Sequence, residues 1–355
     1  MLFRWMFSDR PVDVLSPKAG GTCIGNSSSS LCIVQFNSII MPEMTYFRLV
    51  HRAIDLYNEG KLEEALHLIE KFGDVVEGNR AQILNFKCCI ASRLGRTEMA
   101  MNIMREAIVG TEYWYPYEYL LQDNDLKSIR DQKEFTDLAE ICREREIIAR
   151  KEVRAELKLI MPLERSFTQS PWLIALHGNG DSVALTEKNW HSLLLQGYSL
   201  AFPQSSQITS HETYTWNDLE KGLMEINSHL NDLEKEHDIT GGGWVLSGFS
   251  GGARLALYSV LYGDLHPKGL ILIAPYLPEI KEWEGMVRNL TRKGLKICVL
   301  CGDQDSISFE AGKEVKRILD EIGIPTMLQV VEGLDHDFPD DFAQRLSEML
   351  EFIHN

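Results

Sequence analysis

The sequence has no uninterrupted hydrophobic run of the roughly 18 to 20 residues that a membrane-spanning helix needs. Its first residues are mostly apolar, but Asp9 and Arg10 follow at once, so they lack the apolar core of a secretory signal. Basic residues are also few: 36 Lys and Arg stand against 52 Asp and Glu, which gives a formal charge of −16. A surface this acidic repels phosphate backbones and anionic lipids. We therefore expect no nucleic acid and no membrane as partner.

Cysteine is also sparse, and the seven residues are unevenly spread. An odd number without a regular spacing predicts free thiols in a reducing, cytoplasmic setting. Cys298 and Cys301 have the spacing of a C-x-x-C motif, but they lie in an apolar run typical of a strand. Side chains three residues apart on a strand point to opposite faces. We therefore expect neither a metal site nor a local disulfide at this pair.

The first 42 residues carry neither a helical nor a strand pattern, and they include Gly20-Gly21 and a run of four serines from Ser27. This predicts a disordered segment. A second interpretation is that natural translation begins at Met41 or Met44, where patterned sequence starts abruptly.

Residues 43–155 have helical periodicity and predict an all-helical domain. Gly60 and Gly95 lie about 35 residues apart, as do Ala65 and Ala100. A glycine in the turn and a small alanine where helices cross, repeated at this period, resembles the tetratricopeptide repeat. The pattern leaves two roles open: a bundle that only packs on the rest of the chain, or a surface that docks a protein partner.

Residues 156–355 predict an α/β domain, because short apolar runs now alternate with helical ones. Such alternation is typical of a mainly parallel sheet covered by helices on both faces, with reactive groups in loops at the carboxyl ends of strands. The expected strands are 157–160, 172–176, 199–202, 244–246, 269–273, 295–300 and 326–331. Expected helices between them include 216–236, 253–262 and 309–322.

The strongest chemical signal is Gly248-Phe-Ser250-Gly-Gly252, which lies between an expected strand and an expected helix. A tight strand-to-helix turn strains the central residue, and it needs small residues two positions before and after. Such a turn projects the Ser250 hydroxyl above the sheet as a nucleophile, at a helix N-terminus that favours developing negative charge.

A serine nucleophile needs a base, and the base needs a carboxylate that orients it. His336 follows the last expected strand, and Asp305, or less favourably Asp303, follows the strand before it. The order Ser250, Asp305, His336 is that of nucleophile, acid and base in α/β-hydrolases. His177 ends an earlier strand and is interpreted as a loop-shaping residue rather than a base.

The reaction also needs donors for the oxyanion of the tetrahedral intermediate. The loop His177-Gly-Asn-Gly-Asp181 follows the strand 172–176 and is expected to face the turn of Ser250. The backbone N–H groups of Asn179 and Gly251 are therefore the predicted oxyanion hole.

Together these motifs resemble the α/β-hydrolase superfamily from about residue 155 to the C-terminus, and within it the compact phospholipase/carboxylesterase-like and dienelactone-hydrolase-like esterases. The resemblance implies Ser250 as nucleophile, His336 as base and then acid, Asp305 as orienting acid, and the amides of Asn179 and Gly251 as oxyanion hole. The helical region before residue 155 departs from that pattern, and no long insertion stands between Pro275 and Gly294. The cleft is expected to be open unless the helical domain covers it.

The leading hypothesis is a serine hydrolase that acts on a small-molecule ester or thioester and needs no metal or organic cofactor. A serine peptidase or an acyltransferase is the second hypothesis, since the same three groups serve amides and other acyl acceptors. The third is an inactive hydrolase-like binding module with a helical docking surface. The complete set of catalytic groups argues against this third hypothesis.

Overall fold

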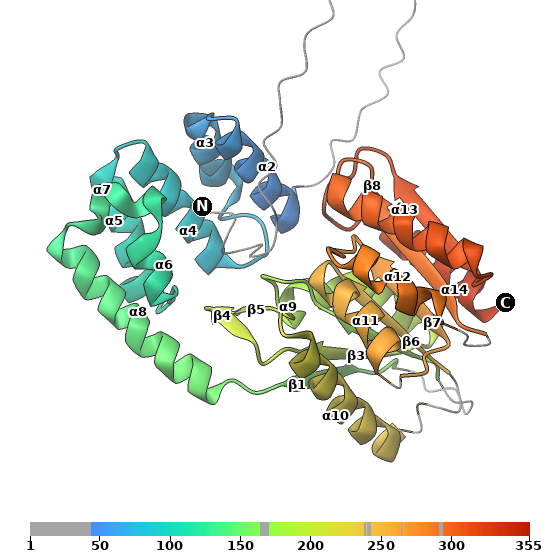
Figure 1. Ribbon diagram of the computed structural model, residues 1–355. Helices are drawn as coiled ribbons and strands as arrows, with labels where there is room; N and C mark the ends of the chain where they lie inside the picture. Colours follow the sequence, from blue (N-terminus) through green and yellow to red (C-terminus); the bar gives the residue numbers. More distant parts are fainter. Residues whose placement is uncertain (1–43, 164–169, 238, 240–242, 264, 291–293) are drawn as a thin grey trace, which may run out of the picture.

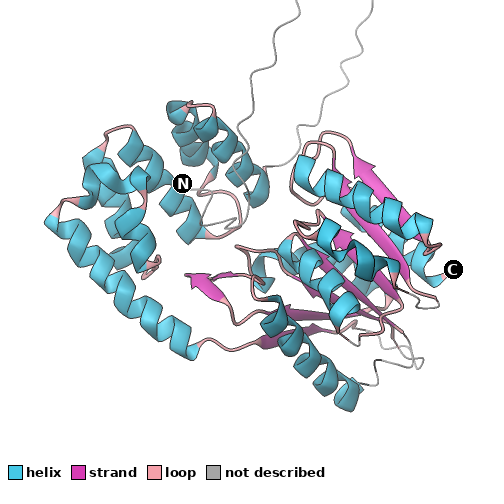
Figure 2. Cartoon of the chain, viewed as in Figure 1, coloured by secondary structure: helices cyan, strands magenta, loops and turns pink. Residues whose placement is uncertain are grey.

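The structure, a computed structural model, describes residues 44–163, 170–237, 239, 243–263, 265–290 and 294–355. An all-helical region comes first, and a region built on a seven-stranded sheet follows (Figures 1 and 2). This architecture confirms the predicted fold class. The disorder or later start predicted for residues 1–42 lies outside the described residues.

Two helix pairs open the helical region, and a glycine stands between the members of each pair. Gly60 and Gly95 have φ angles of 77° and 72°, a left-handed conformation that favours glycine. Ala65 and Ala100 are both fully buried. The repeated spacing of the sequence thus coincides with two successive helix pairs. Their helices are α2 (Tyr46–Asn58) with α3 (Leu62–Phe72), and α4 (Arg80–Arg93) with α5 (Thr97–Arg105).

Shorter elements follow, and a long helix then leads to the sheet (Figure 1). They are the π-helical turn η1 (Glu106–Gly110), α6 (Tyr117–Gln122), the 3-10 turn η2 (Asn124–Leu126), α7 (Lys127–Arg130) and the long α8 (Lys133–Glu152). The first strand begins at Glu156. The boundary expected at residue 155 therefore falls in the connection between α8 and this strand.

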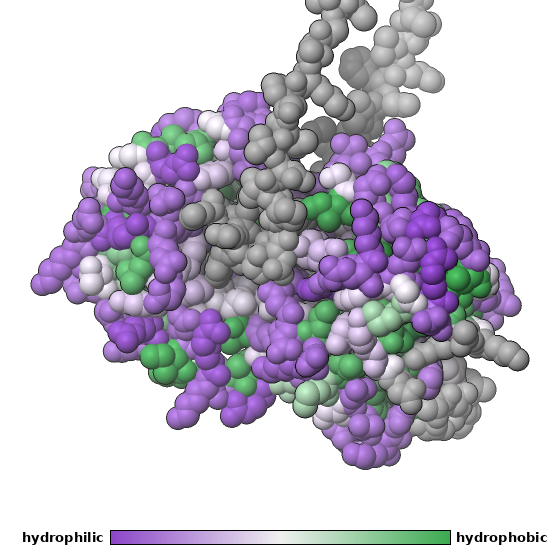
Figure 3. All heavy atoms as spheres, in the orientation of Figure 1, coloured by the Kyte–Doolittle hydropathy of each residue, from purple (hydrophilic) through white to green (hydrophobic). Residues whose placement is uncertain are grey.

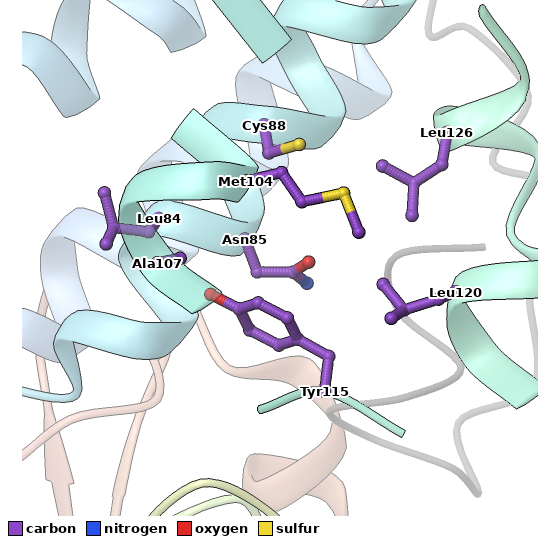
Figure 4. A pocket seen from close by; sticks show the side chains of 8 residues that line it. All are labelled: Leu84, Asn85, Cys88, Met104, Ala107, Tyr115, Leu120 and Leu126. Atoms are coloured by element: carbon purple, nitrogen blue, oxygen red, sulfur yellow. The ribbon is translucent and has the colours of Figure 1, made fainter. Parts of the chain in front are cut away.

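The helical region has its own hydrophobic core, formed by residues of α2 to α8. A cavity remains in this core, and the amide of Asn85 points into it among mostly apolar side chains (Figure 4). Its volume is about 10 Å³. A space of that size holds at most one water molecule, so it is too small for a substrate.

One sheet carries the second region, in the strand order β1-β3-β2-β6-β7-β8-β9. β1 pairs with β3 in antiparallel fashion, and the other neighbouring pairs are parallel. The strands are β1 (Glu156–Ile160), β2 (Trp172–Leu176), β3 (Ser199–Gln204), β6 (Trp244–Phe249), β7 (Gly269–Ile273), β8 (Lys296–Gly302) and β9 (Thr326–Val331). A separate hairpin joins β4 (Ile208–Ser210) to β5 (Thr213–Tyr214).

Helices cover both faces of this sheet (Figure 2). Successive strand residues alternate between the two cores, as Leu173 and Ile174 do. One core includes α10 (Leu219–His237), α11 (Gly251–Tyr262), α12 (Ile280–Arg288) and α13 (Ser306–Glu321). The other includes α9 (Val183–Thr186), the 3-10 helix η3 (Glu187–Gln196) and α14 (Phe342–His354).

The same alternation separates Cys298 from Cys301 on β8. The thiol of Cys298 donates to the carbonyl of Met349 in α14, at 3.7 Å. Cys301 instead lies beside Gly312 of α13. Both thiols are buried and free. In the described part of the chain, no group of three or more His, Cys, Asp or Glu side chains is arranged to hold a metal ion.

The face in Figure 3 is mainly hydrophilic, and the hydrophobic residues described on it lie in small scattered groups. None of the described helices is both long and apolar enough to cross a membrane.

Gly222 and Gly285 both lie inside helices of the α/β region, but their surroundings differ. A Cβ at Gly222 would lie 2.8 Å from Leu255 Cδ2 and 3.2 Å from Trp216 Cε3. A Cβ at Gly285 would have no heavy atom within 4 Å. Of these two glycines, only Gly222 lies where α10 packs closely against a neighbouring helix, α11.

We expect Gly285→Ala to raise the free energy of unfolding by about 0.5–1 kcal/mol, because alanine favours helix more than glycine does. Gly222→Ala should lower it by about 1–3 kcal/mol, because Leu255 and Trp216 must shift. Urea unfolding followed by circular dichroism measures both. Equal stabilisation by the two substitutions would contradict the packing of α10 against α11.

Candidate active site

The chemically active side chains singled out in the sequence lie at one edge of the sheet. Ser250 follows β6, Asp305 follows β8, and His336 lies in the loop after β9. β6, β7, β8 and β9 are consecutive parallel strands, so their carboxyl ends meet at the same edge. Three segments far apart in the sequence are thereby brought together.

His336 lies between the other two side chains. Its Nε2 is 2.8 Å from Ser250 Oγ, and its Nδ1 is 2.5 Å from Asp305 Oδ2. The three residues are only 2–5% exposed. When Nδ1–H donates to the carboxylate, Nε2 accepts from the serine hydroxyl. This geometry allows a proton to pass from the hydroxyl to the imidazole.

The Asp305 carboxyl is held in its charged form. Burial alone would raise its pKa, but the charge of His336 and the hydrogen bonds from His336 and Ser308 hold the pKa well below the ordinary value. Asp303, the alternative acid, instead accepts from the backbone N–H of Gly333 at 2.8 Å. Of the two candidates, Asp305 is therefore the carboxylate that contacts the imidazole.

The backbone at Ser250 forms a tight turn, with φ 53° and ψ −116°. This conformation is strained for a residue with a Cβ. A Cβ at Gly248 would lie 2.3 Å from the carbonyl carbon of Gly252, and a Cβ at Gly252 would lie 2.4 Å from the carbonyl oxygen of His177. Side chains cannot fit at either position, which explains the small residues of the motif.

The loop 177–181 lies against this turn. A Cβ at Gly251 would lie 2.4 Å from Asn179 Cγ. Asn179 is itself held in place: its Oδ1 accepts from the Trp216 N–H at 2.7 Å, and its Nδ2 donates to Asn217 Oδ1 at 2.8 Å. No hydrogen bond from the backbone N–H of Asn179 or Gly251 is found among the described residues.

Trp216 and Asn217 are site residues that sequence reasoning missed. They stand just before α10, which begins at Leu219, although the sequence predicted a helix from residue 216. Their part in the site depends on how the loop after β2 approaches β5, which an isolated bridge between Asp181 and Tyr214 fixes. No local pattern in the sequence predicts that contact.

His177 shapes the loop, in keeping with its interpretation from the sequence. Its Nε2 accepts from the Ser205 N–H at 3.2 Å, so Nδ1 carries the proton and donates to the Gly178 carbonyl at 2.8 Å. Burial lowers the pKa of His177 to about 4. The ring therefore stays neutral at ordinary pH, and its two nitrogens connect the backbone of Ser205 to that of Gly178.

Helix α2 of the helical region also reaches the site; the sequence left open whether this region covers the cleft. The rings of His51 and His336 have centroids 5.5 Å apart, and those of Phe47 and Phe249 have centroids 5.3 Å apart. Each of these contacts joins segments more than 200 residues apart, so no spacing in the sequence could reveal them.

Comparisons with known proteins agree with this architecture. A family model described as "A/B hydrolase-like, N-terminal domain" matches residues 45–150, and one described as "Phospholipase/Carboxylesterase" matches residues 217–354. The crystal structure of an uncharacterized protein from Bacillus cereus ATCC 10987 is similar, with 38% sequence identity and a TM-score of 0.51. The alignment covers 87% of this chain and 99% of that one. A search of curated proteins found no match.

Two esterase structures are more distant. A carboxylesterase from Mesorhizobium loti has 15% identity and a TM-score of 0.46, with 56% of this chain and 96% of that one covered. Est1E from Butyrivibrio proteoclasticus, solved with ferulic acid bound, has 18% identity and a TM-score of 0.46, with coverages of 57% and 97%.

The sheet topology and the two family models identify an α/β-hydrolase fold with an N-terminal helical domain. The chain belongs to the phospholipase/carboxylesterase family of these proteins.

Asp181 is a further buried carboxyl in the loop after β2. Its Oδ1 accepts from the Ser182 N–H at 2.7 Å, while Oδ2 has no partner among the described residues. Burial raises the pKa of Asp181 to about 7, from an ordinary value of 3.8. The folded protein therefore keeps a proton on Asp181 at pH values where the unfolded chain has lost it.

The pKa of Asp181 is higher in the folded protein than in the unfolded chain. Its contribution to the free energy of unfolding is therefore complete below about pH 4, and it is lost as the pH rises to about 7. We expect Asp181→Asn to remove this dependence. As the pH rises between these limits, the free energy of unfolding of the wild type should fall by up to about 1.4 kcal/mol per pH unit more than that of the variant. Urea unfolding of both proteins across this range measures the difference. Parallel stability curves would show that Asp181 does not titrate in this way.

Proposed function

We propose that the protein is a serine hydrolase that cleaves a small-molecule carboxylic ester or thioester, with Ser250 as its nucleophile. The observation that carries the proposal is the hydrogen-bond chain from Ser250 through His336 to Asp305. A serine hydroxyl is a weak nucleophile at neutral pH, and an imidazole within hydrogen-bond reach can activate it. Membership of a phospholipase/carboxylesterase family supports an ester as substrate.

In the proposed reaction, Ser250 Oγ attacks the acyl carbon while His336 Nε2 takes the hydroxyl proton. The tetrahedral intermediate collapses as the C–O or C–S bond of the substrate breaks, and His336 returns the proton to the leaving alcohol or thiol. Water then attacks the acyl-enzyme with His336 again as base, and the acid is released. Asp305 orients the imidazole and stabilises its charged form throughout.

Charge develops on the substrate oxygen during both steps. The proposed donors to it are the backbone N–H groups of Asn179 and Gly251, which belong to facing loops. Loss of one such donor typically costs about 2.7–4 kcal/mol of transition-state stabilisation. The side-chain hydrogen bonds of Asn179 to Trp216 and Asn217 support this role, because they fix the loop before substrate binds.

We expect Ser250→Ala to abolish covalent labelling by a fluorophosphonate probe and to lower kcat by at least about 10⁴-fold, because no nucleophile remains. The assay uses a panel of acyl chain lengths on one chromogenic alcohol, beside matching thioesters and aminoacyl amides. Wild-type turnover of esters or thioesters, and not of amides, is the expected result. Labelling of the Ser250→Ala protein would refute the nucleophile, and faster cleavage of amides would favour a peptidase.

Asp305→Asn and Asp303→Asn form a matched pair, since both remove a carboxylate from the same loop. We expect Asp305→Asn to lower kcat by about 10³- to 10⁴-fold, because the amide no longer holds the imidazole in the required tautomer. Asp303→Asn should leave kcat within about twofold, because Asp303 is exposed and bonds the backbone of Gly333 instead. Steady-state kinetics at one pH separates them. The reverse ranking would exchange the roles of the two residues.

A further inference from the structure

Two carboxylates flank the histidine of the site, and helix α2 contacts both. Asp335 and Asp337 stand directly before and after His336 in the chain. Asp335 Oδ2 lies 3.6 Å from His51 Nδ1, and the ring of His51 packs against the ring of His336. The helical domain therefore contacts the loop of the base on either side of the imidazole.

The contacts to Asp337 are the more complete. Its Oδ2 accepts from Thr45 Oγ at 2.8 Å and lies 3.3 Å from Arg48 Nε. Its Oδ1 accepts from the Phe338 N–H at 2.7 Å. Arg48 also reaches Asp340, with 2.7 Å between Nη2 and Oδ1. One guanidinium thus joins two carboxylates of the loop, and a planar guanidinium suits such a bridge.

Burial makes these partners necessary. The side chain of Asp337 is only 5% exposed. Burial raises the pKa of its carboxyl, while the hydrogen bonds from Thr45 and Phe338 and the charge of Arg48 act against that rise. A buried carboxylate without a cation either takes up a proton or favours a positive charge nearby. Besides Arg48, a group whose positive charge acts on this carboxyl is His336, next to it in the chain.

The first turn of α2 faces the same carboxylate. Thr45 caps the helix by accepting from the Arg48 N–H at 3.1 Å, and the same hydroxyl donates to Asp337. A helix N-terminus carries partial positive charge, which adds to the attraction. The start of α2 is therefore electrostatically matched to the loop of His336.

Several groups face His336, so the charge of each matters for its protonation. Those in contact with its ring are Ser250 at the turn after β6, Asp305 and Ser308 at the start of α13, and His51 on α2. One step further out, Arg48 on α2 pairs with Asp337, and Asp335 lies beside His51. Among these described groups, Arg48 alone is permanently positive.

We propose that Arg48 of the helical domain is a positioning residue for the hydrolase reaction. It holds the loop that carries His336, and it offsets the carboxylate charge of Asp337 beside the base. The proposal rests on the proposed function, because it assigns His336 as the base. Under this proposal the helical domain contributes to the rate of the reaction through Arg48, in addition to packing against the α/β region.

The test compares full-length variants with wild type by kcat, KM and the pH profile of kcat/KM on the best ester of the panel. Arg48→Met should lower kcat/KM by about 10- to 100-fold, mostly through kcat. The acid limb of the kcat/KM profile of this variant should move to higher pH by about half a unit or more, since the unpaired carboxylate of Asp337 favours the imidazolium form of His336. Arg48→Lys should lose less, because an ammonium keeps the charge but cannot bridge both carboxylates.

Two further variants separate electrostatics from structure. Arg52→Met removes the same charge from an exposed position on α2 and should leave kcat/KM within about twofold. Combining Arg48→Met with Asp337→Asn removes the unpaired carboxylate and should return the acid limb to its wild-type position. A purely structural role for Arg48 predicts no such recovery.

The outcomes are distinct. An Arg48→Met protein with wild-type kcat/KM and an unchanged acid limb overturns the proposal, as does a combined variant whose acid limb stays displaced. Circular dichroism shows whether Arg48→Met folds. If it does not, Arg48→Lys and the combined variant test the proposal instead. Absence of ester turnover and probe labelling in wild type would instead refute the proposed function itself.

Discussion

The close backbone contact between the turn of Ser250 and the loop after β2 is the constraint on which the site depends. A Cβ at Gly252 would overlap the carbonyl oxygen of His177, so the two loops can meet only because this position is glycine. That contact brings Asn179 beside Gly251, the two residues whose backbone N–H groups are proposed to bind the substrate oxygen. The sheet supplies the rest, because consecutive parallel strands deliver their loops to the same edge.

Around this contact, three buried aspartates show how surroundings set the behaviour of one residue type. Asp305 is charged because His336 and Ser308 supply donors and an opposite charge. Asp337 has Thr45 and Arg48 to offset its burial. Asp181 has one oxygen without a partner among the described residues, and its pKa rises to about 7. Partners, rather than depth alone, decide which carboxyl keeps its charge.

The parts that the sequence predicts are those with strong local signals. β2, β7 and β9 have the expected bounds. β2 and β7 are continuous apolar runs, which are typical of buried strands, whereas β9 is only partly buried. The start of α11 is less well predicted: the helix begins at Gly251, although glycine favours no helix. Helix α14 is absent from the expectations despite the helical spacing of Leu346 and Leu350. The choice between Asp303 and Asp305 required geometry.

The contacts of α2 with the site could not be predicted, because they depend on how two separately patterned regions dock. In the sequence, Thr45 is an ordinary helix cap and Arg48 an ordinary surface cation; only the fold sets them against Asp337. Their position also bears on the open cleft expected for a hydrolase without a lid. Ser250 is only 5% exposed, and α2 packs on the loop of His336. The helical region therefore lies against the loop of the proposed base, a contact that the sequence alone leaves open.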